Sequence, residues 1–110
     1  MSLALAAGQP VEIAITSIAK TLGAPYVTQR TLDLAKQNLE SVTVVPDSEA
    51  VEALLLIAER LKVITEPAAS CTLAAATRLK ENFGARSKVV LILCGGNTSI
   101  RDACEYLELC

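Results

Sequence analysis

The hydrophobic pattern of this chain is strongest in one short stretch near its C-terminal end. Residues 89–94 are apolar without interruption, and Gly95 and Gly96 follow them directly. A short apolar run that stops at glycine is typical of a strand buried on both faces, as in a parallel sheet covered by helices. We therefore predict that residues 89–94 form the best strand of the chain, with a tight glycine turn after it.

Elsewhere apolar residues recur at spacings of three and four, which indicates helices with one buried face. The clearest case starts at the cap candidates Asp47 and Ser48. A helix is also predicted after the glycine turn, because Ser99 and Asp102 have the spacing of a capping box. We expect helices over residues 27–38, 47–62, 67–83 and 99–109, a helix end within 1–9, and a short helix or packed loop within 13–23.

Strand candidates are fewer than helices. Residues 41–45 are mostly β-branched and end at Pro46, and residues 63–64 allow only a very short strand. The expected fold class is therefore α/β: a fragment of a helix-flanked, mainly parallel sheet with few strands and about four helices. Two or three short strands make a poor sheet alone. The pattern thus predicts a sheet that needs further strands to satisfy its edges.

The composition removes several classes of function. The net charge is −2 without a basic stripe, and aromatic residues make up only 3% of the chain, so a nucleic-acid partner is not expected. No apolar run approaches the roughly 20 residues that span a bilayer, and no signal peptide is visible, so we expect no membrane partner and a cytoplasmic location. Histidine is absent and the four cysteines lack a Cys-x-x-Cys spacing, which argues against a zinc site and favours free thiols.

The turn after the apolar strand is the candidate site. In open α/β sheets, ligands bind just beyond the carboxyl ends of the strands, which is where Gly95 and Gly96 fall. Glycine lets a ligand approach the backbone closely, and Cys94 would place a thiol beside that ligand. A plain strand-to-helix connection has the same spacing, and a cysteine in an apolar strand is often only a small hydrophobic residue.

Four motifs together resemble a known family. They are Ile-Thr-Ser-Ile-Ala-Lys-Thr-Leu-Gly-Ala at 15–24, Ser-Glu-Ala-Val at 48–51, Thr-Glu-Pro-Ala at 65–68 and Leu-Cys-Gly-Gly-Asn at 93–97. In this order and at these spacings they resemble the C-terminal third of the serine/threonine dehydratases. Those are pyridoxal-phosphate (PLP) enzymes of the tryptophan-synthase β fold type, also called fold type II.

The resemblance implies roles for individual residues. Cys94 matches the residue that contacts the pyridine nitrogen of PLP, and Gly95, Gly96 and Asn97 match the turn that follows it. Glu66 matches a position near the cofactor side of the sheet. Leu22 and Ala24 match positions whose main-chain carbonyls help to bind a monovalent or divalent cation, for which oxygen ligands are suited.

The implied activity is that of an ammonia-lyase. Such an enzyme deaminates L-serine or L-threonine to a 2-oxo acid and ammonia, takes an amino acid as its substrate, and is expected to be a homo-oligomer. The family's Schiff-base lysine, in a Ser-x-Lys-x-Arg setting, and its glycine-rich phosphate loop do not occur in these 110 residues. Residues 1–110 are therefore expected to be an incomplete C-terminal part of the catalytic domain that contains no catalytic residue and is inactive alone.

Other readings of the same residues remain open. A racemase or a threonine synthase of the same fold type would share these motifs. A stand-alone α/β domain is another alternative, with the glycine turn binding a small molecule or the helix over 47–62 forming a dimer face. The chain also departs from the family pattern at Ser70, where the relatives commonly have a glycine.

Overall fold

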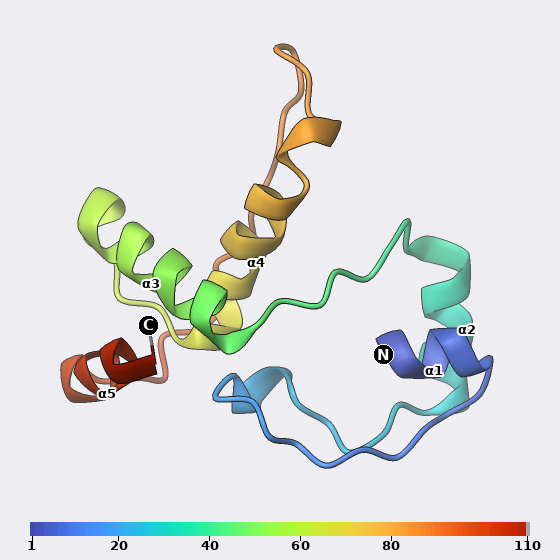
Figure 1. Ribbon diagram of the computed structural model, residues 1–110. Coiled ribbons are helices and arrows are strands. Elements are labelled where there is room, and N and C mark those ends of the chain that lie inside the picture. The colour runs from blue at the N-terminus through green and yellow to red at the C-terminus, as the bar shows by residue number, and fades with distance from the viewer. Residues whose placement is uncertain (110) are drawn as a thin grey trace. The chain divides into compact units, whose positions relative to one another are not determined.

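The computed structural model describes residues 1–109, and every regular element within that range is a helix (Figure 1). The chain divides into two compact units, Met1–Val44 and the part that begins at Val45. Each unit has its own packed helices. No helix within residues 1–109 has both the length and the apolar character that crossing a bilayer requires.

The first unit contains two α-helices, α1 (Ser2–Ala7) and α2 (Gln29–Asn38). The first ends at Gly8, whose left-handed backbone (φ 71°) suits a glycine at a helix end. The second starts after Thr28, whose hydroxyl accepts a hydrogen bond from the Thr31 N–H at 3.2 Å. Between them lie loops and one short 3₁₀ turn, so the packed-loop alternative holds for most of residues 13–23.

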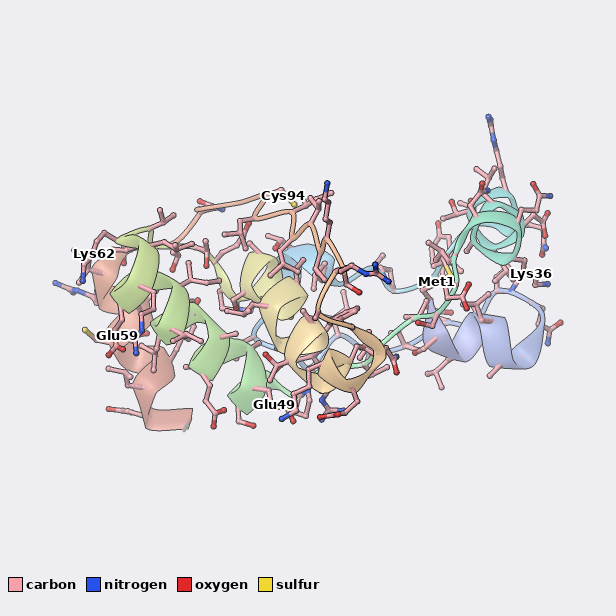
Figure 2. All side chains as sticks on the ribbon, turned by 90° about the horizontal axis from the view of Figure 1, so that it is seen from above. Met1, Lys36, Glu49, Glu59, Lys62 and Cys94 are labelled. Atoms are coloured by element: carbon pink, nitrogen blue, oxygen red, sulfur yellow. The ribbon has the colours of Figure 1, made fainter. Side chains whose placement is uncertain are left out.

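Contacts between these two helices define the small core of the first unit. Ala4, Leu32 and Ala35 are buried there. The Lys36 ammonium donates a hydrogen bond to the Gly8 carbonyl oxygen at 3.0 Å, which ties α2 to the end of α1 (Figure 2). The first unit therefore contains two helices in contact and the loop between them.

The second unit is built on the pair formed by α3 and α4. Helix α3 ends where Lys62 takes a left-handed conformation (φ 60°) and donates from its ammonium to the Glu59 carbonyl oxygen (Figure 2). Helix α4 starts with proline at its first position, which suits a residue that has no N–H to donate. The elements in order are α3 (Asp47–Leu61), α4 (Pro67–Arg78), η2 (Lys80–Asn82), α5 (Ile100–Tyr106) and η3 (Leu107–Leu109).

Small side chains allow α3 and α4 to pack closely. Ala50 and Ala53 of α3 and Ala69 and Ala74 of α4 are all buried. The hydroxyl of Ser70, which is fully buried, lies 2.6 Å from the Ala50 carbonyl oxygen and 2.9 Å from the carbonyl oxygen of Pro67 in its own helix. Its single proton therefore serves a bond between the two helices as well as one within α4.

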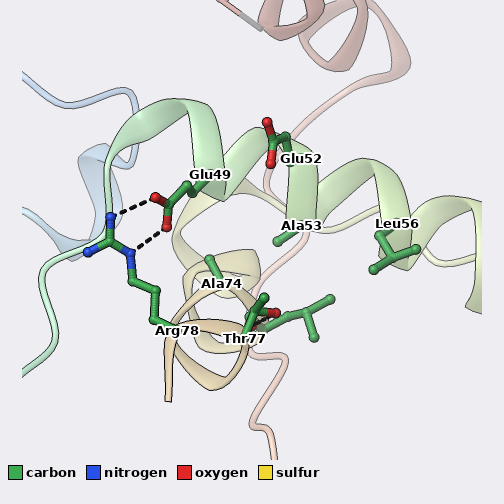
Figure 3. Close-up of a pocket in the computed structure, with 8 residues that line it drawn as sticks. Glu49, Glu52, Ala53, Leu56, Ala74, Thr77 and Arg78 are labelled. Carbon is green, nitrogen blue, oxygen red and sulfur yellow. Dashed lines mark hydrogen bonds and ion pairs between the residues drawn. The ribbon is translucent and has the colours of Figure 1, made fainter. Parts of the chain in front are cut away.

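An ion pair also joins the two helices at their solvent side. The Arg78 guanidinium donates two hydrogen bonds to the Glu49 carboxylate, at 2.5 and 2.6 Å (Figure 3). Both side chains are more than a third exposed, so water screens the attraction. The hydrogen bond from Arg78 holds the pKa of the Glu49 carboxyl below its usual value of 4.5.

The expected strands are not formed within residues 1–109, so the predictions of strands at 41–45, 63–64 and 89–94 are not confirmed. The segment after η2 instead runs as an extended trace back along α4 (Figure 1). A strand is defined by hydrogen bonds to a neighbouring strand, and the described part of the chain supplies none. The apolar pattern indicates a preference for extended backbone. Such a segment becomes part of a sheet only when a neighbouring strand pairs with it.

Helix boundaries also differ from expectation, and α2 starts at Gln29 instead of residue 27. Pro46 is the N-cap of α3, so Asp47 is its first residue and not its cap. Helix α4 ends at Arg78 and continues only as a 3₁₀ turn, short of the predicted end at residue 83. The capping box of Ser99 and Asp102 is present as predicted, although α5 itself ends at Tyr106 and passes into a 3₁₀ turn.

The hydrogen bond from the Ser70 hydroxyl to the Ala50 carbonyl oxygen predicts the results of two matched substitutions. Ser70→Ala removes a fully buried hydrogen bond and should lower the free energy of unfolding by about 1 kcal/mol. Thr72→Ala removes a hydroxyl that bonds only within α4, and it brings a similar gain in helix propensity. Urea unfolding followed by circular dichroism should therefore show a larger loss for Ser70→Ala. Equal losses would contradict the role of this bond.

The ion pair predicts a dependence of stability on pH. Because the pKa of Glu49 is lowered in the folded chain, its stabilisation is present above the unfolded value of 4.5 and is lost as pH falls through the folded value. Glu49→Gln should flatten the fall in the urea midpoint below pH 4.5. Glu52→Gln removes a charge from the same helix without breaking the pair, and should leave that fall in place.

Candidate functional site

The candidate site is the turn that connects the extended apolar segment to α5. Cys94 ends the segment, with its side chain exposed (Figure 2). Gly95 has a positive φ of 128°, a backbone conformation that residues with a Cβ rarely adopt. Gly96 and Asn97 are exposed as well, and the Thr98 N–H donates to the Gly96 carbonyl oxygen at 2.8 Å, which closes the turn before the cap of α5. The structure therefore places four of the predicted site residues on one accessible turn.

The fifth predicted residue lies against the same turn. The Glu66 N–H donates a hydrogen bond to the Gly95 carbonyl oxygen at 3.2 Å. The Glu66 carboxylate fills the space that a Cβ on Gly95 would occupy. Residues that are 29 positions apart in the sequence, one at the N-cap of α4 and one before α5, are thus in direct contact. The positive φ favours glycine at position 95, and an added Cβ would also make the end of the Glu66 side chain move.

The residues just before Glu66 complete the surroundings of the turn. A Cβ on Gly96 would lie 3.5 Å from the Ile64 carbonyl oxygen, so the two backbone segments run close together. Thr65 is only 2% exposed, and its hydroxyl has no hydrogen-bond partner within residues 1–109. A buried hydroxyl without a hydrogen-bond partner lowers the stability of the fold. This part of the site therefore contains a polar atom whose hydrogen-bonding capacity is unused within the described residues. The sequence analysis did not single out Thr65, and its burial has no sequence pattern that would have revealed it.

The two residues predicted to bind a cation both lie in the first unit. Leu22 ends the 3₁₀ turn η1 (Lys20–Leu22), and both Leu22 and Ala24 are exposed. Gly23 between them packs so closely that an added Cβ would lie 2.8 Å from a methyl carbon of Ile15. Within residues 1–109 no group of three or more carboxylate or thiol side chains could hold a metal ion. A cation here would depend on main-chain carbonyls.

The cysteines in the described range differ in their surroundings. Cys71, Cys94 and Cys104 are free, and only Cys71 is partly buried. Burial, and then the negative charge of Asp47, raise the pKa of the Cys71 thiol. A raised pKa disfavours the reactive thiolate, so Cys71 serves as packing in α4. Cys94 is distinguished by its place on the glycine turn.

A separate cavity lies between α3 and α4, away from the glycine turn in sequence. It has a volume of about 400 Å³, and the Glu49–Arg78 pair forms one wall (Figure 3). Ala53, Leu56 and Ala74 give it an apolar side. Nothing in the sequence indicated a partner for Glu49, because an ion pair between residues 29 positions apart has no local pattern. None of the predicted site residues lines this cavity.

This chain is similar to known proteins of one family over most of its length. The family model described as "Pyridoxal-phosphate dependent enzyme" matches residues 1–95. The chain is 42% identical to the mouse protein "Serine dehydratase-like" over 115 aligned positions, which cover 96% of this chain and 35% of that protein. It is 32% identical to the "Catabolic L-serine/threonine dehydratase" of Saccharomyces cerevisiae, over 92% of this chain and 31% of that protein.

A solved structure agrees with these relatives. A fungal L-serine ammonia-lyase from Rhizomucor miehei matches 96% of this chain with a TM-score of 0.87 at 26% identity, and the match covers 36% of that enzyme. The described helices therefore fit α/β fold neighbours, although no strand is formed within residues 1–109. The chain spans about a third of the length of the relatives it matches. From the family model and these relatives together, this chain belongs to the pyridoxal-phosphate dependent enzyme family.

Proposed function

We propose that this chain is the C-terminal part of a PLP-dependent ammonia-lyase that deaminates L-serine or L-threonine to a 2-oxo acid and ammonia. The observation that carries the proposal is the exposed Cys94 on a turn that Glu66 and Gly95 hold in place. The similarity to a serine dehydratase over almost the whole chain supports the choice of reaction.

The residues on this turn fit a flat aromatic cofactor. Gly95 and Gly96 present no side chain, so a ring can approach the backbone, and the thiol of Cys94 is open to solvent. A thiol is a weak donor and a weak acceptor, which suits contact with the nitrogen of a pyridine ring. Cys94 would hold that nitrogen, and Gly95, Gly96 and Asn97 would form the backbone beside it. When bound, PLP supplies an electron sink for charge that develops on the amino-acid substrate.

Each predicted site residue then has a defined role toward the cofactor, the turn or the cation. Cys94 offers a weak hydrogen-bonding group where a carboxylate would place a full negative charge, so it favours the ring nitrogen without its proton. Glu66 fixes the conformation of Gly95 through its N–H and through the position of its carboxylate. The main-chain carbonyls of Leu22 and Ala24 would bind a monovalent or divalent cation in the first unit.

The chain by itself is not expected to catalyse the reaction. PLP enzymes of this kind hold the cofactor through a lysine and anchor its phosphate. None of the lysines in these 110 residues lies in the family's Ser-x-Lys-x-Arg setting, and Gly95-Gly96 is the only pair of adjacent glycines. The proposed contribution of this chain to the enzyme is therefore limited to the turn at 94–97, which would face the cofactor, and to the main-chain carbonyls of Leu22 and Ala24.

A chimera tests the proposed function. In it, this chain replaces the matched third of the mouse serine dehydratase-like protein. The chimera should release a 2-oxo acid from L-serine or L-threonine, whereas the isolated chain should release none. Cys94→Ala in the chimera should lower kcat by about tenfold, which corresponds to the loss of one hydrogen bond of about 1.4 kcal/mol.

Cys104→Ala is the matched control, because Cys104 is also an exposed free thiol but lies on α5. Its kcat should stay close to that of the unchanged chimera. A chimera that forms D-serine without any 2-oxo acid would favour the racemase alternative. Equal effects of the two cysteine substitutions would contradict the role given to Cys94.

The contact between Glu66 and Gly95 predicts a second result. Gly95→Ala requires a residue with a Cβ to adopt φ 128° and to displace the Glu66 carboxylate. The hydrogen bond from the Glu66 N–H should be lost, so that amide should exchange faster with deuterium. Gly84→Ala is the matched control, because an added Cβ at Gly84 meets no atom within 4 Å. Unchanged exchange at Glu66 in Gly95→Ala would contradict the described contact.

A further inference from the structure

The cavity between α3 and α4 follows from the way in which the two helices cross. They are joined near their starts, where the Ser70 hydroxyl lies 2.6 Å from the Ala50 carbonyl oxygen. From there the helices diverge (Figure 1), and Ala53 and Ala74 on the facing sides fill little of the space between them. A cavity of about 400 Å³ remains. Its volume is that of a pocket for a small organic ligand.

The apolar part of the lining comes from both helices. On α3, Leu56 lies three residues after Ala53, so both side chains belong to one face of that helix. Leu73 and Ala74 supply the opposite side from α4. Leu56 is 44% exposed, so the described chain leaves much of this apolar surface open to solvent.

The polar groups of the lining differ in how far they are already engaged. The Arg78 guanidinium donates from Nε and from one terminal nitrogen to the two oxygens of Glu49 (Figure 3). The Thr77 hydroxyl donates to the Leu73 carbonyl oxygen at 3.0 Å. The exposed Glu52 carboxylate has neither a hydrogen bond nor an ion pair within residues 1–109. Glu49 and Arg78 compensate each other, so the lining keeps one uncompensated negative charge, on Glu52.

We propose that this cavity binds a small organic monocation, a primary amine with an apolar body. The ammonium of the ligand pairs with the Glu52 carboxylate, and the apolar body lies against Leu56 and Leu73. Glu52 follows Glu49 by three residues on the same helix face, so the negative potential of both carboxylates favours a cation there. Covering Leu56 removes apolar surface from water. The site is separate from the glycine turn, and the proposal does not depend on the proposed function.

Other small ligands match the lining less well. An anion or a zwitterion would bring a carboxylate beside Glu49 and Glu52, and the Arg78 guanidinium has only its second terminal nitrogen left to bind it. A metal ion would gain nothing from the apolar part of the lining. It prefers several oxygen ligands, and no group of three or more carboxylate or thiol side chains is present within residues 1–109.

A titration with phenethylamine tests the proposal, followed by the amide NMR shifts of the ¹⁵N-labelled chain. The shifts should saturate with a millimolar Kd and should be confined to the parts of α3 and α4 that line the cavity. Phenethyl alcohol has the same body without the charge, and its Kd should be about fivefold higher. L-phenylalanine, which adds a carboxylate, should also bind more weakly. Shifts that do not saturate, or tighter binding of L-phenylalanine, would overturn the proposal.

Two matched pairs of substitutions separate the charge from the apolar contact. Glu52→Gln should raise the Kd of phenethylamine about fivefold, whereas Glu59→Gln, at an exposed glutamate of α3 outside the lining, should leave it unchanged. Leu56→Ala should weaken phenethylamine and phenethyl alcohol to the same degree. Leu61→Ala is its control, since Leu61 is 59% exposed on α3 and does not line the cavity. Equal Kd values within either pair would contradict the site.

The chimera with the mouse serine dehydratase-like protein tests whether the cavity stays open in a complete domain. The proton signals of phenethylamine should broaden when the chimera is added, and should broaden less with its Glu52→Gln variant. Equal broadening by the two chimeras, or none by either, would show that the cavity does not take the amine in the complete domain and would overturn the proposal. The release of a 2-oxo acid is measured separately, so a failure of the proposed function remains distinguishable from a failure of this site.

Discussion

The contact between Glu66 and the glycine turn is the interaction on which the candidate site depends. Helix α4 begins at Pro67, directly after the N-cap Glu66, and α5 begins directly after the turn's cap at Ser99. The bond from the Glu66 N–H to the Gly95 carbonyl oxygen therefore joins the starts of two helices. The Glu66 carboxylate occupies the space that a Gly95 side chain would need, and Cys94 directly precedes Gly95 on the turn. A turn joined to α4 by a backbone hydrogen bond, with one exposed thiol, suits contact with a cofactor.

The packing of α3 against α4 provides the support for that turn. The alanines that line the interface let the helices approach closely, and the buried hydroxyl of Ser70 bridges them. The glycine that the family resemblance leads one to expect at this position could not make this hydrogen bond. The start of α4, and with it Glu66, is held by this interface and not by the glycine turn alone.

Much of the helical structure could be predicted from the sequence because its causes are local. The periodicity of α3, the proline that starts α4 and the capping box at Ser99 are each read from a few neighbouring residues. The strands could not be predicted as formed structure, since the sequence of 89–94 encodes extended backbone but not its partner. The family resemblance implied only that Glu66 lies near the cofactor side of a sheet, and its contact with Gly95 came from the structure. The buried hydroxyls of Thr65 and Ser70 depend on tertiary packing that no local pattern reports.

The central claim is that the Cys94 thiol faces the pyridine nitrogen of the cofactor in the assembled domain. The most direct measurement is the ¹⁵N chemical shift of the pyridine nitrogen of labelled PLP, bound to the chimera with the mouse serine dehydratase-like protein. With Cys94 in place the shift should be that of a nitrogen without a proton, and Cys94→Asp should move it toward the protonated value because a carboxylate stabilises the proton. The same shift in both proteins would contradict the assignment of Cys94 and the site built around it.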